Sequence, residues 1–162
     1  MKKTIYIFLI LILSLSACEK KEDAPQNEVV SGQQVENDQK ALSSVYDDIK
    51  SSAKNELTVI NEEAVGDKFD VDTTKAEEFI FALAGGESAE MIVLVKSNDL
   101  DYFEEKIKEY TEKKAAEFDS YGPEQAELLR NVNLNKKGEY IICAVSENAE
   151  EICEKAFEAL AV

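Results

Sequence analysis

Two apolar segments joined by a short glycine-containing loop constrain the fold of this 162-residue chain more than any other feature. They span residues 78–84 and 90–96 and are rich in Phe, Ile, Leu and Val, which favour β-strands. Gly85-Gly86 in the loop suits the positive φ angles of a hairpin turn. Because both faces of each segment are apolar, we expect an antiparallel pair near the centre of a sheet, with other elements covering each face.

A second hairpin and four helices are predicted around this pair. Residues 132–135 and 139–146 are predicted to form two strands that turn at residues 136–138. Apolar spacing predicts helices over residues 38–53, from 98 or 99 to about 120, over 124–129 and over 148–160, and the stretch 55–75 is expected to be irregular with at most one helical turn. The predicted fold class is α+β, a four-stranded antiparallel sheet built from two hairpins with helices packed on it, preceded by an N-terminal amphipathic helix.

The N-terminal segment has the pattern of a secretory leader. Lys2 and Lys3 precede an apolar run over residues 5–15, and small residues follow it. A membrane-spanning helix needs about 20 apolar residues, so this run is too short to be a permanent span. Residues 1–17 are therefore predicted to be a signal peptide.

Cys18 ends the tetrapeptide Leu15-Ser16-Ala17-Cys18, which resembles the lipobox of bacterial lipoproteins. The resemblance implies signal cleavage between Ala17 and Cys18 and lipid attachment through a diacylglyceryl group on the Cys18 sulfur. Two acyl chains make such an attachment stable where one would not. The alternative is an ordinary signal peptide that happens to contain a cysteine. We expect a protein anchored in the cell membrane and facing outside the cytoplasm.

The remaining chain divides into a tether and one domain. Residues 18–37 are polar and contain no aromatic residue, which is typical of a flexible, lipid-anchored tether. Residues 38–162 have the length of a single α+β domain that can bury its own core.

The charge balance excludes one class of partner. The chain has 18 basic and 34 acidic residues, and because cleavage of the leader removes Lys2 and Lys3, the mature net charge would change from −16 to −18. Binding to nucleic acid depends on clustered Lys and Arg, and Arg130 is the only arginine. We therefore expect no nucleic acid partner, and membrane attachment only through the covalent anchor.

The residue inventory argues against most catalytic chemistry. The chain has no histidine, which excludes Ser-His-Asp and Cys-His mechanisms and most catalytic zinc sites. A serine activated by lysine or a pair of carboxylates remains open, but no spacing singles one out. Asp70, Asp72 and Thr74 are spaced like the first calcium ligands of an EF-hand loop, yet Lys75 and Phe81 occupy positions where that loop needs Gly and Glu. No metal or cofactor is predicted.

Two groups of residues leave alternatives open. Cys143 and Cys153 are either two buried free thiols or a disulfide between a strand and the last helix. Four tyrosines, at positions 102, 110, 121 and 140, are either half-buried edges of the core or the lining of a groove for a glycan or peptide.

From about residue 77 to 160 the sequence resembles a family of bacterial lipoproteins known as a domain of unknown function. The resemblance rests on Glu90-Met91-Ile92-Val93-Leu94-Val95-Lys96, on the Asp-rich start of the helix after it, on Tyr121-Gly122-Pro123-Glu124, and on Gly138-Glu139-Tyr140-Ile141 leading into Val145-Ser146. It implies a lipid-anchored protein outside the cytoplasm and brings no activity, ligand or catalytic residue with it.

Three functional hypotheses follow. The first is a non-catalytic module that binds an envelope protein or a wall component. The alternative is a small-molecule or cation receptor associated with a transporter, although such receptors usually close two domains on a ligand. The third is an enzyme that works without histidine.

Overall fold

The computed structural model describes residues 40–161, and its centre is a pair of buried antiparallel strands, β3 (Met91–Ser97) and β5 (Tyr140–Val145). Every residue of β5 and all but one of β3 are buried. The strands lie third and fourth in a five-stranded sheet of order β1-β2-β3-β5-β4. Both strands of the first hairpin were predicted to lie near the sheet centre, and this is confirmed for β3, whereas its partner β2 (Ala76–Ala84) lies second in the order and is only partly buried.

Each central strand pairs outward with its hairpin partner. β2 (Ala76–Ala84) is antiparallel to β3, and β4 (Asn133–Lys137) is antiparallel to β5. The turns use glycine where the backbone needs a positive φ, with Gly86 at 71° and Gly138 at 59°. Both predicted hairpins are therefore present, and the β3–β5 pairing joins them into one antiparallel sheet.

The predicted number of four strands is wrong, because a fifth strand, β1 (Leu57–Val59), extends the sheet beyond β2. Leu57 pairs with Ala84 and Val59 with Ala82. β1 has three residues and lies at the sheet edge, where Val59 remains 46% exposed. A strand this short has too few residues to show an alternating pattern, so only its pairing with β2 defines it.

The stretch 55–75 is also more ordered than predicted. It contains the eight-residue helix α2 (Glu62–Phe69) and a short 3-10 helix, η2 (Thr73–Lys75). The Asn61 side chain caps α2 by accepting a hydrogen bond from the Ala64 amide at 2.9 Å. Val65 and Phe69 are the only buried residues of α2, and two apolar positions are too few for a periodic signal.

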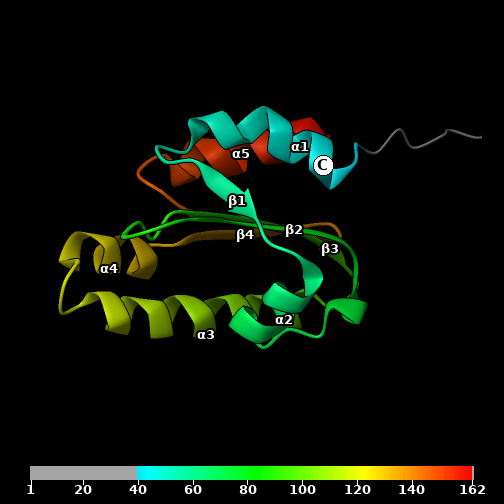
Figure 1. The fold of residues 1–162 in the computed structure, drawn as a ribbon. Coiled ribbons are helices and arrows are strands. Elements are labelled where there is room, and N and C mark those ends of the chain that lie inside the picture. The colour runs from blue at the N-terminus through cyan, green and yellow to red at the C-terminus, as the bar shows by residue number, and fades with distance from the viewer. Residues whose placement is uncertain (1–39, 162) are drawn as a thin grey trace, which may run out of the picture. The chain divides into compact units, whose positions relative to one another are not determined.

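Helices cover both faces of the sheet (Figure 1). α1 (Leu42–Ile49), which continues into the 3-10 helix η1 (Lys50–Ser52), lies with α5 (Ala149–Leu160) over one face. α2, α3 (Leu100–Phe118) and α4 (Pro123–Arg130) lie over the other. The predicted α+β class and the helices around the hairpins are confirmed, with boundaries that differ by a few residues.

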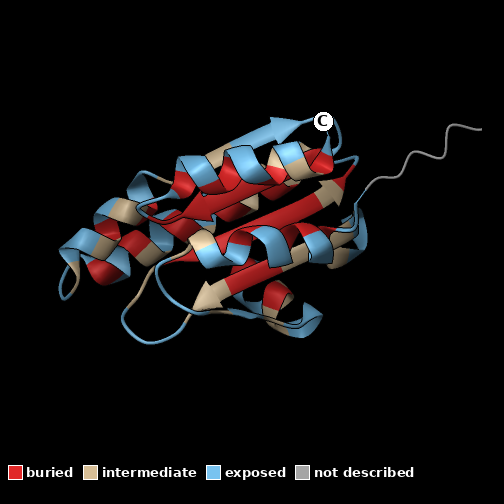
Figure 2. Ribbon diagram, turned by 90° about the horizontal axis from the view of Figure 1, so that it is seen from above, coloured by how far each residue is buried: buried red, intermediate tan, exposed pale blue. Residues whose placement is uncertain are grey.

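The sheet separates two hydrophobic cores, because alternate residues of a strand point to opposite faces. On β3, Val93 packs in the core beneath α3, and Leu94 packs in the core beneath α1 and α5. Figure 2 shows the consequence, with buried residues along the strands and on the helix faces that meet them.

The predicted signal peptide (1–17), the lipid site Cys18 and the tether (18–37) lie outside the described residues. Within residues 40–161, no helix combines the length and apolarity needed to cross a membrane.

The two cysteines of the domain lie on opposite faces of the sheet. Cys143 of β5 packs in the core beneath α3, whereas Cys153 of α5 packs in the core beneath α1 and α5. Both thiols are free. Of the two alternatives that the sequence left open, the structure has the free thiols, because the sheet backbone lies between them.

We predict that both thiols are unreactive in the folded protein. Burial raises the pKa of the Cys143 thiol well above its ordinary value and raises the pKa of Cys153 to about 11, which leaves almost no reactive thiolate at neutral pH. Mass spectrometry after iodoacetamide treatment should find neither residue alkylated in the native protein and both alkylated after denaturation without reductant. Two unlabelled cysteines in the denatured sample would reveal a disulfide.

Candidate functional site

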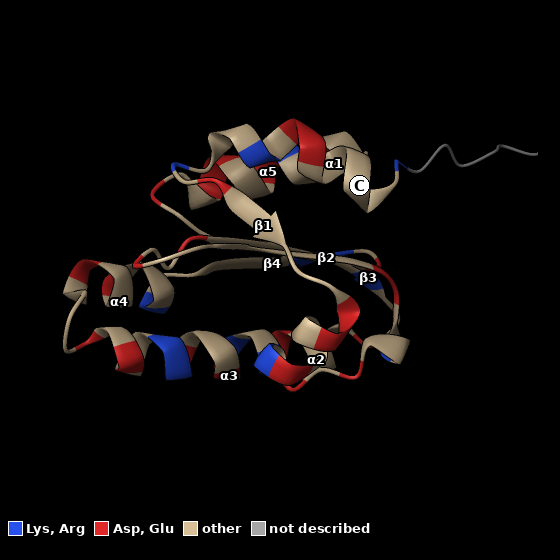
Figure 3. Cartoon of the chain, viewed as in Figure 1, with Lys and Arg blue, Asp and Glu red and all other residues tan. Residues whose placement is uncertain are grey.

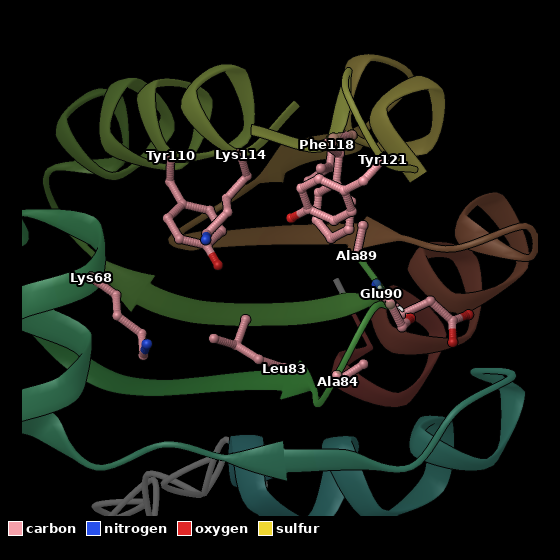
Figure 4. A pocket seen from close by; sticks show the side chains of 12 residues that line it. Lys68, Leu83, Ala84, Ala89, Glu90, Tyr110, Lys114, Phe118 and Tyr121 are labelled. Carbon is pink, nitrogen blue, oxygen red and sulfur yellow. Dashed lines mark hydrogen bonds between the residues drawn. The ribbon is translucent and has the colours of Figure 1, made fainter. Parts of the chain in front are cut away.

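A pocket of about 190 Å³ lies beneath the β2–β3 turn, on the face of the sheet that α3 covers (Figure 4). α2 contributes Lys68, α3 contributes Tyr110, Lys114 and Phe118, and the end of α4 contributes Leu129. The turn supplies backbone and small side chains around Ser88. Residues far apart in the sequence therefore meet at one place only after the hairpin and the helices have packed together.

Helical spacing explains why three α3 residues share the pocket. Tyr110, Lys114 and Phe118 are four residues apart and so lie along one side of the helix. Phe118 is buried, and the Tyr110 ring stacks on Phe69 with ring centroids 3.9 Å apart. These contacts hold the aromatic side chains in place, while the adjacent Tyr121 is 61% exposed at the pocket mouth.

The turn is held against α4 and not left free. The Gln125 side-chain oxygen accepts a hydrogen bond from the Ala89 amide at 2.8 Å. Gly122 lies directly before α4 and packs so closely on Phe118 that an added Cβ atom would lie 2.9 Å from its ring. The glycine thus allows the chain to leave α3 and enter α4 beside the pocket.

Glu90, directly before β3, is the buried carboxylate of the site, with 3% of its surface exposed. One oxygen, Oε1, accepts from the Ser146 hydroxyl at 2.7 Å and from the Lys54 amide at 3.1 Å. The other, Oε2, accepts from the amide and the side-chain nitrogen of Asn55, both at 2.7 Å. Glu90 therefore ties the loop before β1 and the end of β5 to the start of β3.

These four donors keep Glu90 ionised. Burial alone would raise the pKa of the Glu90 carboxyl, but the hydrogen bonds from Ser146, Lys54 and Asn55 outweigh it and lower the pKa below its ordinary value. Both oxygens already have two donors, so Glu90 has no free lone pair directed at a ligand. Its role is structural, and it is poorly suited to act as a general base.

A second hollow of about 400 Å³ lies on the other side of the turn and shares Ser88 and Glu90 with the pocket. Lys54 and Glu147 form an ion pair across it, with 3.0 Å between Nζ and Oε1. Most of its lining is polar, and Glu87 adds a further acidic side chain to it.

Three polar groups reach into the pocket from the helices. Lys68 has no hydrogen bond or ion pair with any residue of the described chain, and the Tyr110 hydroxyl has no hydrogen-bond partner there either. Lys114 pairs with Glu117 at 2.5 Å, and this hydrogen bond raises the pKa of the lysine. Burial raises the pKa of Tyr110, so its hydroxyl stays protonated and can donate.

The four tyrosines that the sequence singled out divide between the two alternatives. Tyr110 and Tyr121 border the pocket. The Tyr102 hydroxyl accepts a hydrogen bond from the Asp72 amide at 2.6 Å, and Tyr140 is buried on the opposite face of the sheet. The sequence analysis proposed none of Glu90, Lys68 and Lys114 as a site residue, and named Glu90 only as the first residue of a family motif. Only Glu90 carried a signal, as an acidic residue at the head of an otherwise apolar strand.

The acidic residues with calcium-loop spacing have other partners. Asp70 pairs with Lys106 at 2.7 Å, and Asp72 accepts from both the amide and the hydroxyl of Thr74. Among residues 40–161, no three or more Cys, Asp or Glu side chains are grouped so that they could hold a metal ion.

Comparison with known families places the pocket within a recognised region. Residues 50–146 match the family described as Domain of unknown function (DUF4358). The chain belongs to the DUF4358 family. The resemblance to a domain of unknown function, inferred from residues 77–160, is thus confirmed over residues 77–146, and the match begins earlier, at η1. That the protein is a lipoprotein stays a prediction. No match was found among curated proteins or among solved structures.

The DUF4358 match spans all five strands and every residue that lines the pocket, and it leaves out α1 and α5. The family description names no activity, so membership does not assign a reaction or a ligand. The pocket of this DUF4358 domain therefore has to be interpreted from its own chemistry.

We predict that Glu90→Gln lowers the free energy of unfolding by about 2–3 kcal/mol at pH 7, because an amide cannot accept all four hydrogen bonds and places a donor against a donor. Urea unfolding measures this loss. A Glu87→Gln variant, in the exposed part of the same turn, is the matched control and should change stability little.

The difference between wild type and Glu90→Gln should also depend on pH. The folded pKa of Glu90 is lowered, so its contribution is complete above the ordinary glutamate pKa of about 4.3 and declines as the pH falls toward the folded value. Urea unfolding at pH 7 and pH 3.5 should show the difference shrinking. A difference that is constant over this range would contradict an ionised Glu90.

Proposed function

We propose that the protein is a lipid-anchored, non-catalytic binding module at the cell envelope, held outside the cytoplasm through Cys18, and that the pocket beneath the β2–β3 turn is its binding site. Its partner is an envelope protein or a wall component.

The observation that carries this proposal is that the acidic and the donor groups of the pocket differ in their hydrogen bonding. The buried carboxylate of Glu90 is saturated by four donors, whereas Lys68 and the Tyr110 hydroxyl are available to a ligand. A site whose reactive group is satisfied and whose donors are available is suited to binding and poorly suited to proton transfer.

The electrostatics of the domain support a non-catalytic role. A general acid or base at neutral pH needs a carboxyl with a raised pKa or a lysine with a lowered one. Among the described residues, every carboxyl with a shifted pKa has it lowered, as for Glu104 at about 2, and every lysine with a shifted pKa has it raised. The chain also has no histidine.

A screen that compares the wild type with a pocket-filled variant tests the binding role. Ala89 packs against the core beneath α3 and lines the pocket, so Ala89→Trp should occupy the space where a ligand would lie. The full-length protein in detergent is screened by thermal shift against wall fragments, peptides, sugars and divalent cations. We expect at least one compound to raise the melting temperature of the wild type and not of the variant.

Glu87→Trp, in the same turn but outside the pocket, is the control and should retain the response. A response to cations that both tryptophan variants retain would favour the receptor alternative. The absence of any response in the wild type would contradict a small-ligand pocket.

The anchor is tested by a single substitution. Cys18→Ser leaves no sulfur to accept the diacylglyceryl group, and the domain is too acidic to be retained by anionic lipid. We expect the wild type in the membrane fraction, with mass spectrometry showing a lipidated N-terminal Cys18, and the variant released from the membrane. An unmodified Cys18 in the native protein would overturn this part of the proposal.

A further inference from the structure

We infer that the pocket binds a monocarboxylate with a small apolar body, as found in the free C-terminal residue of a peptide. This inference rests on the proposed binding role of the pocket and specifies the chemistry of its ligand.

The cationic end of the pocket lies between α2 and α3. Lys68 projects from α2, and Tyr110 and Lys114 project from α3 toward the same space (Figure 4). Glu90 lies at the other end of the pocket, where its neutral donors surround it. An anionic group at that end meets the Lys68 ammonium group and the Tyr110 hydroxyl, which have no hydrogen-bond partner in the described chain, and the Lys114 ammonium group, which already pairs with Glu117. It does not need to approach the buried carboxylate of Glu90.

This arrangement stands out in a chain with a net charge of −16. The sequence has 34 acidic and 18 basic residues, and basic and acidic positions are interspersed along α2 and α3 (Figure 3). Lys68 is exposed and, like Lys113, forms no ion pair or hydrogen bond within the described chain, although it lines the pocket together with Lys114. A ligand can therefore bind the Lys68 ammonium group without breaking an ion pair or a hydrogen bond of the described chain.

The net charge of the pocket favours a ligand with a single negative charge. The charged residues that line the pocket are Lys68, Lys114 and Glu90, a net charge of one positive unit, and Lys114 also pairs with Glu117 outside this lining. A shallow hollow alongside adds Lys113 but also Asp67 and Glu117, which leaves the same net charge there. A carboxylate balances this charge, whereas a doubly charged phosphate would exceed it and approach three acidic side chains.

The volume and the apolar lining of the pocket indicate the size and the polarity of the part of the ligand that carries the carboxylate. A cavity of about 150 Å³ can hold benzene, so about 190 Å³ accommodates one small residue together with its carboxylate. Leu83, Phe118 and Leu129 are the large apolar side chains of the lining, and Ala84 and Ala89 add smaller ones. A ligand with a short aliphatic body can pack on these side chains while its carboxylate faces Lys68, Tyr110 and Lys114.

The test uses the full-length protein in detergent and isothermal titration calorimetry. The probe is N-acetyl-alanyl-alanine with a free C-terminal carboxylate, compared with the same dipeptide as its C-terminal amide. We expect the free acid to bind at least about tenfold more tightly, because the amide removes the charged acceptor. Lys68→Gln and Lys114→Gln should each weaken binding of the acid by about fivefold to tenfold, and Tyr110→Phe by several-fold.

Lys108→Gln is the matched control, because Lys108 lies on the same helix, pairs with Glu104 and does not line the pocket. The carboxylate can come from a small free acid or from the C-terminal end of a peptide, and N-acetyl-alanine distinguishes these two sources. A site for a small acid binds N-acetyl-alanine and the dipeptide with equal affinity, whereas a site for a peptide end binds the dipeptide more tightly. Inorganic phosphate should bind more weakly than either.

Three results would overturn the inference. They are equal binding of acid and amide, tighter binding of phosphate than of the carboxylate, and binding that Lys68→Gln and Lys114→Gln leave unchanged. If a neutral compound stabilises the wild type and not Ala89→Trp, the pocket is a binding site and only the carboxylate assignment fails. If no compound distinguishes wild type from Ala89→Trp, the proposed function fails as well.

Discussion

The pairing of β3 with β5 is the interaction on which the rest of the structure depends. It joins two hairpins that are separated in sequence by α3 and α4, and it places Val93 opposite Cys143 in the middle of the sheet. Because these strands are apolar on both faces, neither face can be left to water, and a layer of helices has to cover each. The need to cover both faces of the sheet explains why the domain has two hydrophobic cores and why each helix buries the face that it turns toward the sheet.

The pocket is a consequence of how the sheet ends. Where the β2–β3 hairpin turns, the covering helices continue past the strands, and the turn is fastened by Gln125 on one side and by Glu90 on the other. A buried carboxylate that is satisfied by neutral donors avoids the desolvation of a second, cationic partner. No lysine side chain pairs with Glu90, since Lys114 pairs with Glu117, Lys54 pairs with Glu147, and Lys68 has no partner in the described chain.

Periodicity predicted those parts of the structure that bury many residues. Both hairpins, the long helix α3 and the last helix were visible because each repeats an apolar residue at its own period over several turns or pairs. β1 and α2 were missed because they are short and bury few side chains, so their conformation depends on the neighbours that they meet. At the pocket, the tyrosines were noticed as candidates, but Lys68 and Lys114 look like any solvent-facing lysine in the sequence.

The sequence by itself determined the α+β class, the two hairpins and the family, because these depend on local patterns of hydrophobicity, glycine and motif residues that neighbouring positions supply. Only the tertiary structure decided the fifth strand, the separation of Cys143 from Cys153 and the composition of the pocket. Each of these depends on which residues distant in sequence become neighbours. That is set by the pairing order of the strands and by the face to which each side chain points, and no local pattern encodes either.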